Sequence, residues 1–419
     1  MWSRIKKISS NNKTVIANLG YLGILQIISL FLPLLTYPYL IRVLGKEIYG
    51  EIVLAQAIMA YFSIMINWGF NISATKDIAV HRDNKLYLSE IVSAVFTVKL
   101  LLWMLSFLIL LAIVYFIPAL KHHKLLYFIS FGICFNELLF QQYFFQGIEK
   151  MKYITLINLI SRLIFFCMIF IFVKSQANYL YVPLFNSIGA FIGGLIAFYI
   201  IIFKQKIYLQ NLSFSILKRY FLESMPFFFS RISNVVINKT NTVIIGIVLG
   251  YTEVSYYDLG QKILSVLLIP FDLINQVIYP KVAREKNMYF VRKVILMVLV
   301  LASLLLLGIN IGGKYFIEFL GGSSMLPAIN IVKILTINVL FISVDYFLGN
   351  TILVVKGFYK EFNKSVIYTG LFYLCIIGIL FLSNVHNIYV FAFVSIAVEL
   401  FCLGYRWTVI KKNSLFATN

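Results

Sequence analysis

Residues 225–286 read MPFFFSRISNVVINKTNTVIIGIVLGYTEVSYYDLGQKILSVLLIPFDLINQVIYPKVAREK. They form two apolar limbs joined at YTEVS, and each limb is long enough to cross a bilayer, because about 20 helical residues cover the hydrocarbon thickness. The first limb carries a polar stripe at helical spacing, Arg231, Asn234, Asn238 and Asn241. The second carries Asp258, Gln261, Lys262, Ser265, Asp272, Asn275, Gln276 and Tyr279. A charge at the bilayer centre costs about 2.5–3.5 kcal/mol, so we expect both stripes to face protein or a wet cavity.

The composition around this stretch is that of a polytopic membrane protein. Hydrophobic residues make up 61% of the chain and charged residues only 12%, with a mean hydropathy of +0.91. The basic start leads into an apolar run too long for a cleavable signal peptide. The four cysteines lie inside apolar runs at no metal spacing, so we expect no disulfide framework, no metal site and no cofactor.

The sequence predicts an all-α fold with twelve membrane-spanning helices. The apolar runs cover residues 15–41, 49–74, 89–117, 124–147, 153–174, 179–203, 217–249, 254–281, 291–311, 325–354, 364–383 and 387–410. On the sixth run, Gly189, Gly193 and Gly194 leave room for a close helix neighbour. The loops are short, so no soluble domain is expected.

The basic residues indicate the orientation of the runs. The formal net charge is +20, but its cations are scattered through short loops, which argues against a nucleic-acid partner. Loops on one side, including both termini and Arg406, hold 24 Lys and Arg residues, whereas the opposite loops hold 6. By the positive-inside rule both termini are cytoplasmic, which indicates a multi-pass protein of the bacterial inner membrane that contacts anionic lipid.

An internal repeat divides the chain in two. VLGKEIYGEIVLAQAI (43–58) aligns without a gap on VLGYTEVSYYDLGQKI (248–263), an offset of 205 residues. The polar stripe of the second limb has a counterpart on the second run, Gln56, Ser63, Asn67 and Asn71. We therefore expect two parallel six-helix lobes, 1–209 and 210–419, around a central cavity. This plan is typical of transporters that work by alternating access.

Charged and amide side chains inside the runs are the candidate site residues. Arg162 and Arg231 lie mid-run beside other polar groups, and arginine forks suit phosphate oxygens. The predicted binding residues for a diphosphate or sugar are Arg231, Arg162, Lys262, Lys99, Asn234, Asn238, Gln56, Asn67 and Asn71. Candidates for coupling to H⁺ or Na⁺ are Asp272, Asp345, Asp258 and Glu137. For each charge a purely structural role stays open, such as the favourable i,i+4 pair of Asp258 with Lys262.

Several stretches resemble Wzx-type O-antigen flippases of the polysaccharide biosynthesis protein family. They are LPLLTYPYLIRVLGKEIYGEIVLAQAI, QQYFFQGIEKMKYITLINLISRL, PFFFSRISNVVINKTNTVIIGIVLG and YYDLGQKI with YPKVAR. The resemblance implies membership of the multidrug/oligosaccharidyl-lipid/polysaccharide exporter superfamily. It also implies transfer of undecaprenyl-diphosphate-linked oligosaccharide to the periplasmic leaflet and partners among other polysaccharide assembly proteins. Two departures are that the first helix has no acid and that the chain has no room for the two extra helices of lipid II flippases.

Two alternatives remain from the sequence alone. One is a membrane enzyme, either a polysaccharide polymerase or a lipid-linked glycosyltransferase. The absence of a large extramembrane loop, of DxD and of HExxH argues against this class. The other is a different transporter, such as a drug exporter of the same superfamily or a major facilitator, although the turn after the second run, SATKDIAVHRDNK, lacks the major-facilitator pattern.

Overall fold

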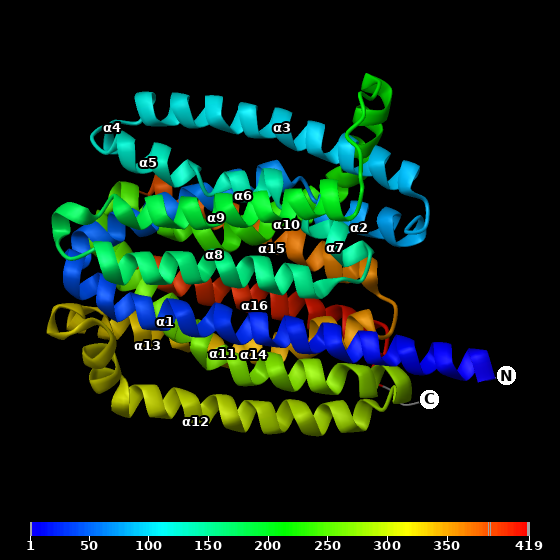
Figure 1. The fold of residues 1–419 in the computed structure, drawn as a ribbon. Coiled ribbons are helices and arrows are strands. Elements are labelled where there is room, and N and C mark those ends of the chain that lie inside the picture. The colour runs from blue at the N-terminus through cyan, green and yellow to red at the C-terminus, as the bar shows by residue number, and fades with distance from the viewer. Residues whose placement is uncertain (1, 384, 386, 417–419) are drawn as a thin grey trace. The chain divides into compact units, whose positions relative to one another are not determined.

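All regular secondary structure is helical in the part of the chain that the structure, a computed structural model, describes: residues 2–383, 385 and 387–416 (Figure 1). Within these residues, nine helical stretches are long and apolar enough to cross a membrane, and one of them, Phe31–Val80, contains the end of the first predicted run and the whole of the second. An all-α polytopic membrane protein is therefore confirmed, and the number twelve stays a prediction. Residues 1 and 419, at the ends of the two predicted lobes, lie outside the described residues.

The helices follow the predicted runs closely. The first half contains α1 (Trp2–Asn67), α2 (Phe70–Val80), α3 (Lys85–Phe116), α4 (Pro118–Lys121), α5 (Lys124–Phe131), α6 (Cys134–Leu139), α7 (Gln142–Gly147), α8 (Met151–Phe172), η1 (Gln176–Asn178), α9 (Tyr181–Tyr199) and the π-helical η2 (Ile200–Lys204). The second half contains α10 (Phe214–Val248), α11 (Tyr251–Glu285), α12 (Met288–Gly321), η3 (Ser323–Ala328), α13 (Ile329–Thr336), α14 (Asn338–Tyr346), the π-helical η4 (Phe347–Val354), α15 (Tyr359–Leu382) and α16 (Ile388–Lys412).

Two compact units divide the chain. The N-terminal unit comprises Met1–Leu44 and Ile58–Ile232, and the C-terminal unit comprises Gly45–Ala57 and Ser233–Asn419. The long helices α1 and α10 therefore contribute residues to both units. The predicted lobes, 1–209 and 210–419, follow the sequence repeat and stay a prediction.

The repeat is visible in the backbone at two equivalent glycines. Gly45 interrupts α1 with φ 78° and ψ 165°, and Gly250, 205 residues later, precedes α11 with φ 105° and ψ 173°. Both conformations lie where a side chain is rarely tolerated, so glycine is the residue that fits. The aligned VLG motifs thus share one kink, which supports the repeat read from the sequence.

Immediately after its kink, the 45–57 segment packs closely on the start of α11. A Cβ atom added to Gly50 would lie 1.8 Å from the main-chain oxygen of Tyr251. The hydroxyl of Ser255 donates a hydrogen bond to the main-chain oxygen of Lys46. Further along, the side chain of Leu54 fills the space left by Gly246 on α10. These contacts explain why three turns of α1 belong to the C-terminal unit.

The first turns of α10 pack in the same way within the N-terminal unit. The Trp68 ring stacks between Phe221 and Phe228, with centroid distances of 4.5 and 4.1 Å. Its Nε1 donates to the main-chain oxygen of Phe221 at 3.1 Å. Gly69, with φ 82°, turns the chain beside this stack into α2.

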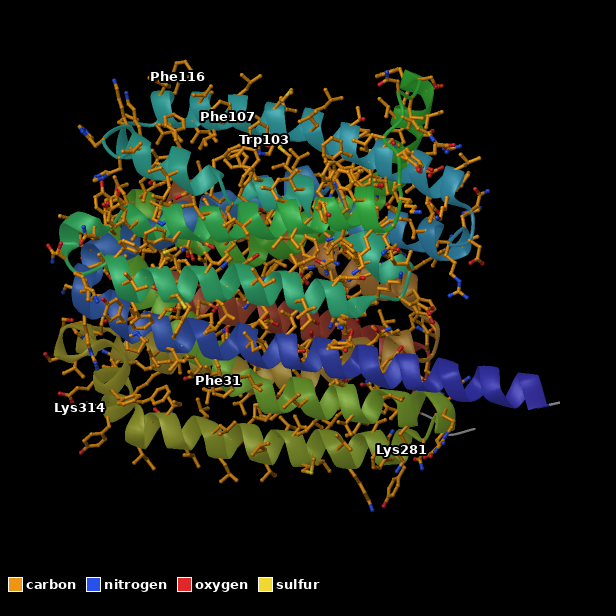
Figure 2. All side chains as sticks on the ribbon, in the orientation of Figure 1. Phe31, Trp103, Phe107, Phe116, Lys281 and Lys314 are labelled. Atoms are coloured by element: carbon orange, nitrogen blue, oxygen red, sulfur yellow. The ribbon has the colours of Figure 1, made fainter. Side chains whose placement is uncertain are left out.

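Small and aromatic residues close the N-terminal unit. The predicted close approach at the sixth run is confirmed, because a Cβ atom on Gly189 would lie 2.5 Å from the main-chain oxygen of Ser161 on α8. Helix α3 runs alongside α4, α5 and α6 (Figure 1). Trp103 and Phe107 lie on the face of α3 turned toward these helices, whereas Phe116 points away from them (Figure 2).

Two membrane runs depart from regular α-helix at equivalent places. The fourth predicted run consists of α5, α6 and α7 and has a non-helical backbone at Phe140 and Gln141. The tenth contains the end of η3, then α13, α14 and the π-helical η4, and its backbone stays helical at Tyr346 and Phe347. With the offset of 205, residues 124–147 correspond to 329–352. Interrupted helices in corresponding halves of a membrane protein commonly mark functional sites.

The packing at Gly50 gives the first prediction. Gly50→Ala places a methyl group against the Tyr251 carbonyl and should lower the free energy of unfolding by about 1–3 kcal/mol. Gly308→Ala on α12, where an added Cβ meets nothing within 4 Å, is the matched control and should leave stability equal or higher. Denaturant unfolding of the detergent-purified protein measures both, and equal stability of the two variants would contradict the packing argument.

Candidate functional site

The structure brings several of the predicted site residues into three polar clusters. The N-terminal unit holds one, around Lys99. The C-terminal unit holds two, around Asp258 and around Asp345. The clusters bring some of the predicted site residues together and leave the two predicted arginines, Arg162 and Arg231, outside.

The Lys99 cluster joins three predicted residues. Lys99 of α3 is fully buried, and its ammonium donates to the main-chain oxygen of Glu137 at 3.0 Å. The Glu137 carboxylate accepts a hydrogen bond from Asn67 Nδ2 at 2.9 Å. The ring of Tyr143 lies 5.4 Å from the ammonium, within the range of a cation–π contact. Lys99 therefore bonds to main chain, which the sequence does not predict.

The Glu137 main-chain oxygen, which Lys99 contacts, has no helical N–H donor because the fourth run breaks between α6 and α7. At the break, Phe140 adopts φ −83° and ψ 90°, and Gln141 adopts φ −77° and ψ 70°. The Gln141 amide donates to Leu139 and the Gln142 amide to Phe140, only two residues back. The carbonyls of Glu137 and Leu138 thereby lose their helical donors.

The Asp258 cluster lies where the two repeat copies meet in the C-terminal unit. The predicted i,i+4 ion pair of Asp258 with Lys262 is confirmed. The Tyr49 hydroxyl donates to Asp258 Oδ2 at 2.9 Å and accepts from Lys262 Nζ at 3.0 Å. Close by, Lys46 Nζ donates to the hydroxyl of Tyr256 at 2.7 Å. Tyr49 and Lys46 are missing from the predicted site, although both lie within the repeat.

The Asp345 cluster is a buried ion pair beside the second interrupted run. Arg406 Nη1 lies 2.5 Å from Asp345 Oδ2 and 3.4 Å from the main-chain oxygen of Asp345. Arg406 Nε donates to Ser365 Oγ at 3.0 Å. A Cβ atom on Gly349 would meet the guanidinium at 2.4 Å, so glycine leaves room for it.

Counting Arg406 among the loop cations is therefore wrong. The residue lies inside α16, only 6% exposed, because Asp345 requires a buried partner. A periodicity argument could have found it, since Glu399 and Arg406 are seven residues apart on one helix face. Glu399 is half-buried.

The two predicted phosphate-binding arginines, both in the N-terminal unit, have no charged partner in the structure. Arg162 on α8 is half-buried and Arg231 on α10 is exposed, and neither makes a hydrogen bond or ion pair with the described residues. Each guanidinium therefore keeps its full capacity to bind an anion.

The remaining predicted residues are amides and one acid. Gln56, Asn234 and Asn238 lie exposed in the C-terminal unit, and Asn238 Nδ2 donates to the main-chain oxygen of Asn234 at 2.7 Å. Asn71 is half-buried, and its Oδ1 has no hydrogen-bond partner in the described chain. Asp272 accepts from Gln276 Nε2 at 2.9 Å.

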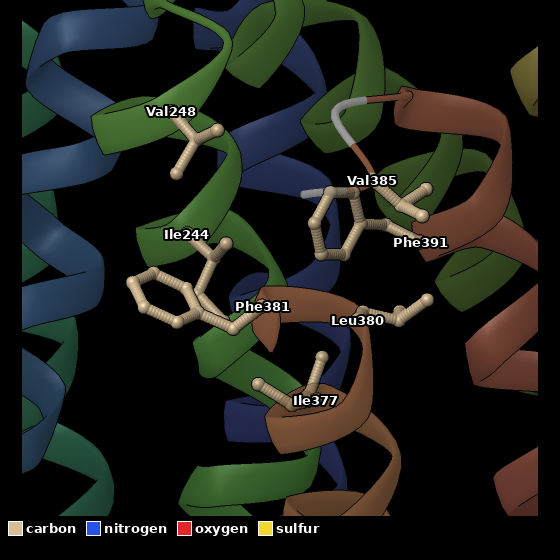
Figure 3. A pocket seen from close by; sticks show the side chains of 7 residues that line it. All are labelled: Ile244, Val248, Ile377, Leu380, Phe381, Val385 and Phe391. Carbon is tan, nitrogen blue, oxygen red and sulfur yellow. The ribbon is translucent and has the colours of Figure 1, made fainter. Parts of the chain in front are cut away.

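A separate pocket in the C-terminal unit is entirely apolar (Figure 3). It lies between α10, α15 and α16, and its lining residues are Ile244, Val248, Ile377, Leu380, Phe381, Val385 and Phe391. With no charged or amide side chain in its lining, it suits hydrocarbon and not a phosphate or sugar.

The Asp345 cluster gives the second prediction. Arg406→Met removes the partner of a buried carboxylate and should cost about 3–5 kcal/mol of unfolding free energy. Arg284→Met, which breaks the exposed pair with Glu285, is the control and should leave stability unchanged. Denaturant unfolding in detergent measures both, and a tolerated Arg406→Met would show that Asp345 needs no counter-ion.

Comparison with known proteins agrees with this architecture. Two relatives are described as "Putative O-antigen transporter". The one from Escherichia coli (strain K12) is 29% identical over 380 residues, covering 88% of this chain and 91% of that protein. The one from Shigella dysenteriae is 28% identical over 319 residues, covering 71% and 78%.

Two solved structures share the fold. An inward-facing multidrug resistance MATE family transporter of the MOP superfamily superposes with a TM-score of 0.72 at 13% identity, over 92% of this chain and 95% of that one. The lipid II flippase MurJ in an inward closed conformation gives 0.69 at 15% identity, over 93% and 87%. The family model for polysaccharide biosynthesis proteins matches residues 15–286, well over half of the sequence. The chain therefore belongs to the polysaccharide biosynthesis protein family.

Proposed function

We propose that this protein is a flippase. It carries an undecaprenyl-diphosphate-linked oligosaccharide, the repeat unit of O-antigen or of a related surface polysaccharide, from the cytoplasmic to the periplasmic leaflet by alternating access. The family membership, the O-antigen transporters among its relatives and the membrane-spanning helices support a transporter and not an enzyme.

The observation that carries the substrate assignment is the pair of unpaired arginines. A guanidinium inside a membrane run is costly unless an anion or water meets it. The half-buried Asp258 and the buried Asp345 are already bound by Lys262 and Arg406, which leaves Arg162 and Arg231 for an external anion. A diphosphate suits them, because an arginine fork binds two phosphate oxygens at once.

The other predicted binding residues are proposed to contact the sugars or to be engaged within the protein. The exposed amides of Gln56, Asn234 and Asn238, with Asn67 and Asn71, supply the donors and acceptors that sugar hydroxyls need. Lys99 and Lys262 are engaged by hydrogen bonds within the protein and do not contact the substrate directly.

We place proton or sodium coupling at Glu137 before the other three candidates. Asp258 and Asp345 are neutralised by direct ion pairs, and Asp272 shares a hydrogen bond with Gln276. Glu137 forms no ion pair among the described residues, and its recorded donor is the neutral amide of Asn67. A carboxylate without a fixed counter-ion is free to bind and release a cation.

The charge distribution supports the cellular setting of the proposal. An excess of Lys and Arg in alternate loops favours the bacterial inner membrane with both termini in the cytoplasm. There the protein meets lipid-linked substrate made on the cytoplasmic face, and other polysaccharide assembly proteins are its expected partners.

Deletion of the gene tests the function. The strain should lose surface polysaccharide and accumulate lipid-linked single repeat units on the cytoplasmic leaflet, because synthesis continues while translocation stops. Extraction of lipid-linked oligosaccharide, with surface staining of the polymer, measures both effects. Normal surface polymer in the deletion strain would refute the proposal, and complementation in trans is the control.

Substitution of Arg231 tests the diphosphate site. Arg231→Ala should reduce translocation about tenfold or more, since a lost charged hydrogen bond is worth about 1.5–3 kcal/mol. Arg231→Lys should retain part of the activity because it keeps the charge but not the fork. Lys314→Ala on the exposed end of α12 is the control. Wild-type translocation by Arg231→Ala, at equal membrane insertion, would remove this residue from the site.

A further inference from the structure

The break in the fourth run leaves two main-chain carbonyls that can be satisfied in two ways. In a continuous helix the amides of Gln141 and Gln142 would donate to the carbonyls of Glu137 and Leu138. In this structure two side chains, and not these backbone amides, donate to the two carbonyls. Lys99 Nζ donates to the Glu137 carbonyl at 3.0 Å, and Gln141 Nε2 donates to the Leu138 carbonyl at 2.5 Å. The broken and the continuous arrangement therefore both pair these carbonyls.

The sequence at the break does not force either arrangement. Residues 134–147 read CFNELLFQQYFFQG and contain no proline, and glycine stands only at the far end. Nothing covalent prevents helical geometry at Phe140 and Gln141. The side chains that meet the carbonyls left by the interruption are those of Lys99 and Gln141.

The surroundings of Lys99 allow it to change partner. An ammonium has three donors, and one recorded hydrogen bond engages it here. If the run became continuous, the Glu137 carbonyl would turn to the Gln141 amide and the ammonium would need another acceptor. The fourth run itself offers two other acceptors. They are the Glu137 carboxylate and Gln141 Oε1, and the latter is buried without a hydrogen-bond partner.

The second half of the chain contains a related contact of a buried cation with main chain, although the backbone there stays helical. In the tenth run, Arg406 of α16 bonds both the main-chain oxygen and the carboxylate of Asp345, just before the π-helical η4. Asp345 lies one helical turn from the position equivalent to Glu137. The fourth and tenth runs thus each carry an acid whose carbonyl accepts from a buried cation of another helix.

We propose that Lys99 is a positioning residue that switches the fourth run between a broken and a continuous form. Its ammonium stabilises the broken form through the Glu137 carbonyl and the continuous form through the Glu137 carboxylate. The inference rests on the proposed function, because alternating access requires elements with two discrete arrangements.

Lys99→Met tests the switch, because it keeps the length of the side chain and removes the donor. Without the ammonium, the Glu137 carbonyl has no donor in the broken form, whereas in the continuous form the Gln141 amide pairs it and Asn67 can still donate to the carboxylate. The run should therefore become continuous. Hydrogen exchange followed by mass spectrometry over residues 134–147 of the full-length protein should then slow by about tenfold at the Gln141 and Gln142 amides. Lys99→Arg keeps a donor and should exchange like the wild type.

Translocation provides the second measurement. Lys99→Met should lower the maximal rate about tenfold with the half-saturating substrate concentration unchanged, because Lys99 is buried away from substrate. Lys174→Met is the matched control, since Lys174 also donates to a main-chain carbonyl, that of Phe170, but at an exposed helix end. It should change neither exchange in 134–147 nor translocation.

Each outcome decides the proposal. Unchanged exchange in Lys99→Met, or lowered stability with unchanged translocation per inserted molecule, would overturn it. If Lys99→Met fails to insert, Gln141→Leu removes the cap on the Leu138 carbonyl and should slow exchange in the same direction. A wild-type protein that moves no lipid-linked sugar would refute the proposed function, whereas slowed exchange in Lys99→Met would still support the switch.

Discussion

The absence of water from the bilayer interior governs the structure of this protein. A charge in that environment costs about 3 kcal/mol when it has no partner, so each one must be matched within the protein or by a ligand. Lys262 is matched by Asp258, Arg406 by Asp345, and Lys99 by a main-chain carbonyl. Arg162 and Arg231 are the arginines of the runs that have no partner within the described residues. We therefore propose a substrate whose phosphate groups match them.

The same constraint applies to the backbone. A helix that breaks inside a membrane frees carbonyls that no water can reach, so breaks are tolerated only where other protein groups meet them. The fourth run satisfies this condition with Lys99 of α3, which donates to the Glu137 carbonyl. In the tenth run, whose backbone stays helical at Tyr346 and Phe347, Arg406 of α16 donates to the Asp345 carbonyl in addition to its ion pair with the carboxylate.

The parts of the fold that depend on local patterns could be predicted. Hydropathy located the membrane runs, helical spacing located the Asp258–Lys262 pair, and small residues marked the close contact of α8 and α9. The break at Gln141 leaves no local signal, because the contact that holds it comes from a residue 42 positions earlier in the chain. Arg406 has only a weak local signal, its seven-residue spacing from Glu399, because its partner Asp345 lies on another helix.

The 45–57 segment joins one half of the sequence to the compact unit of the other. Tyr49 bonds Asp258 and Lys262 across more than 200 residues. A hybrid gene that combines the first half of one family member with the second half of another would insert a foreign segment beneath α11. Such recombinants should assemble only when both parents carry matching residues at these three positions, so the halves of this family are constrained to evolve together.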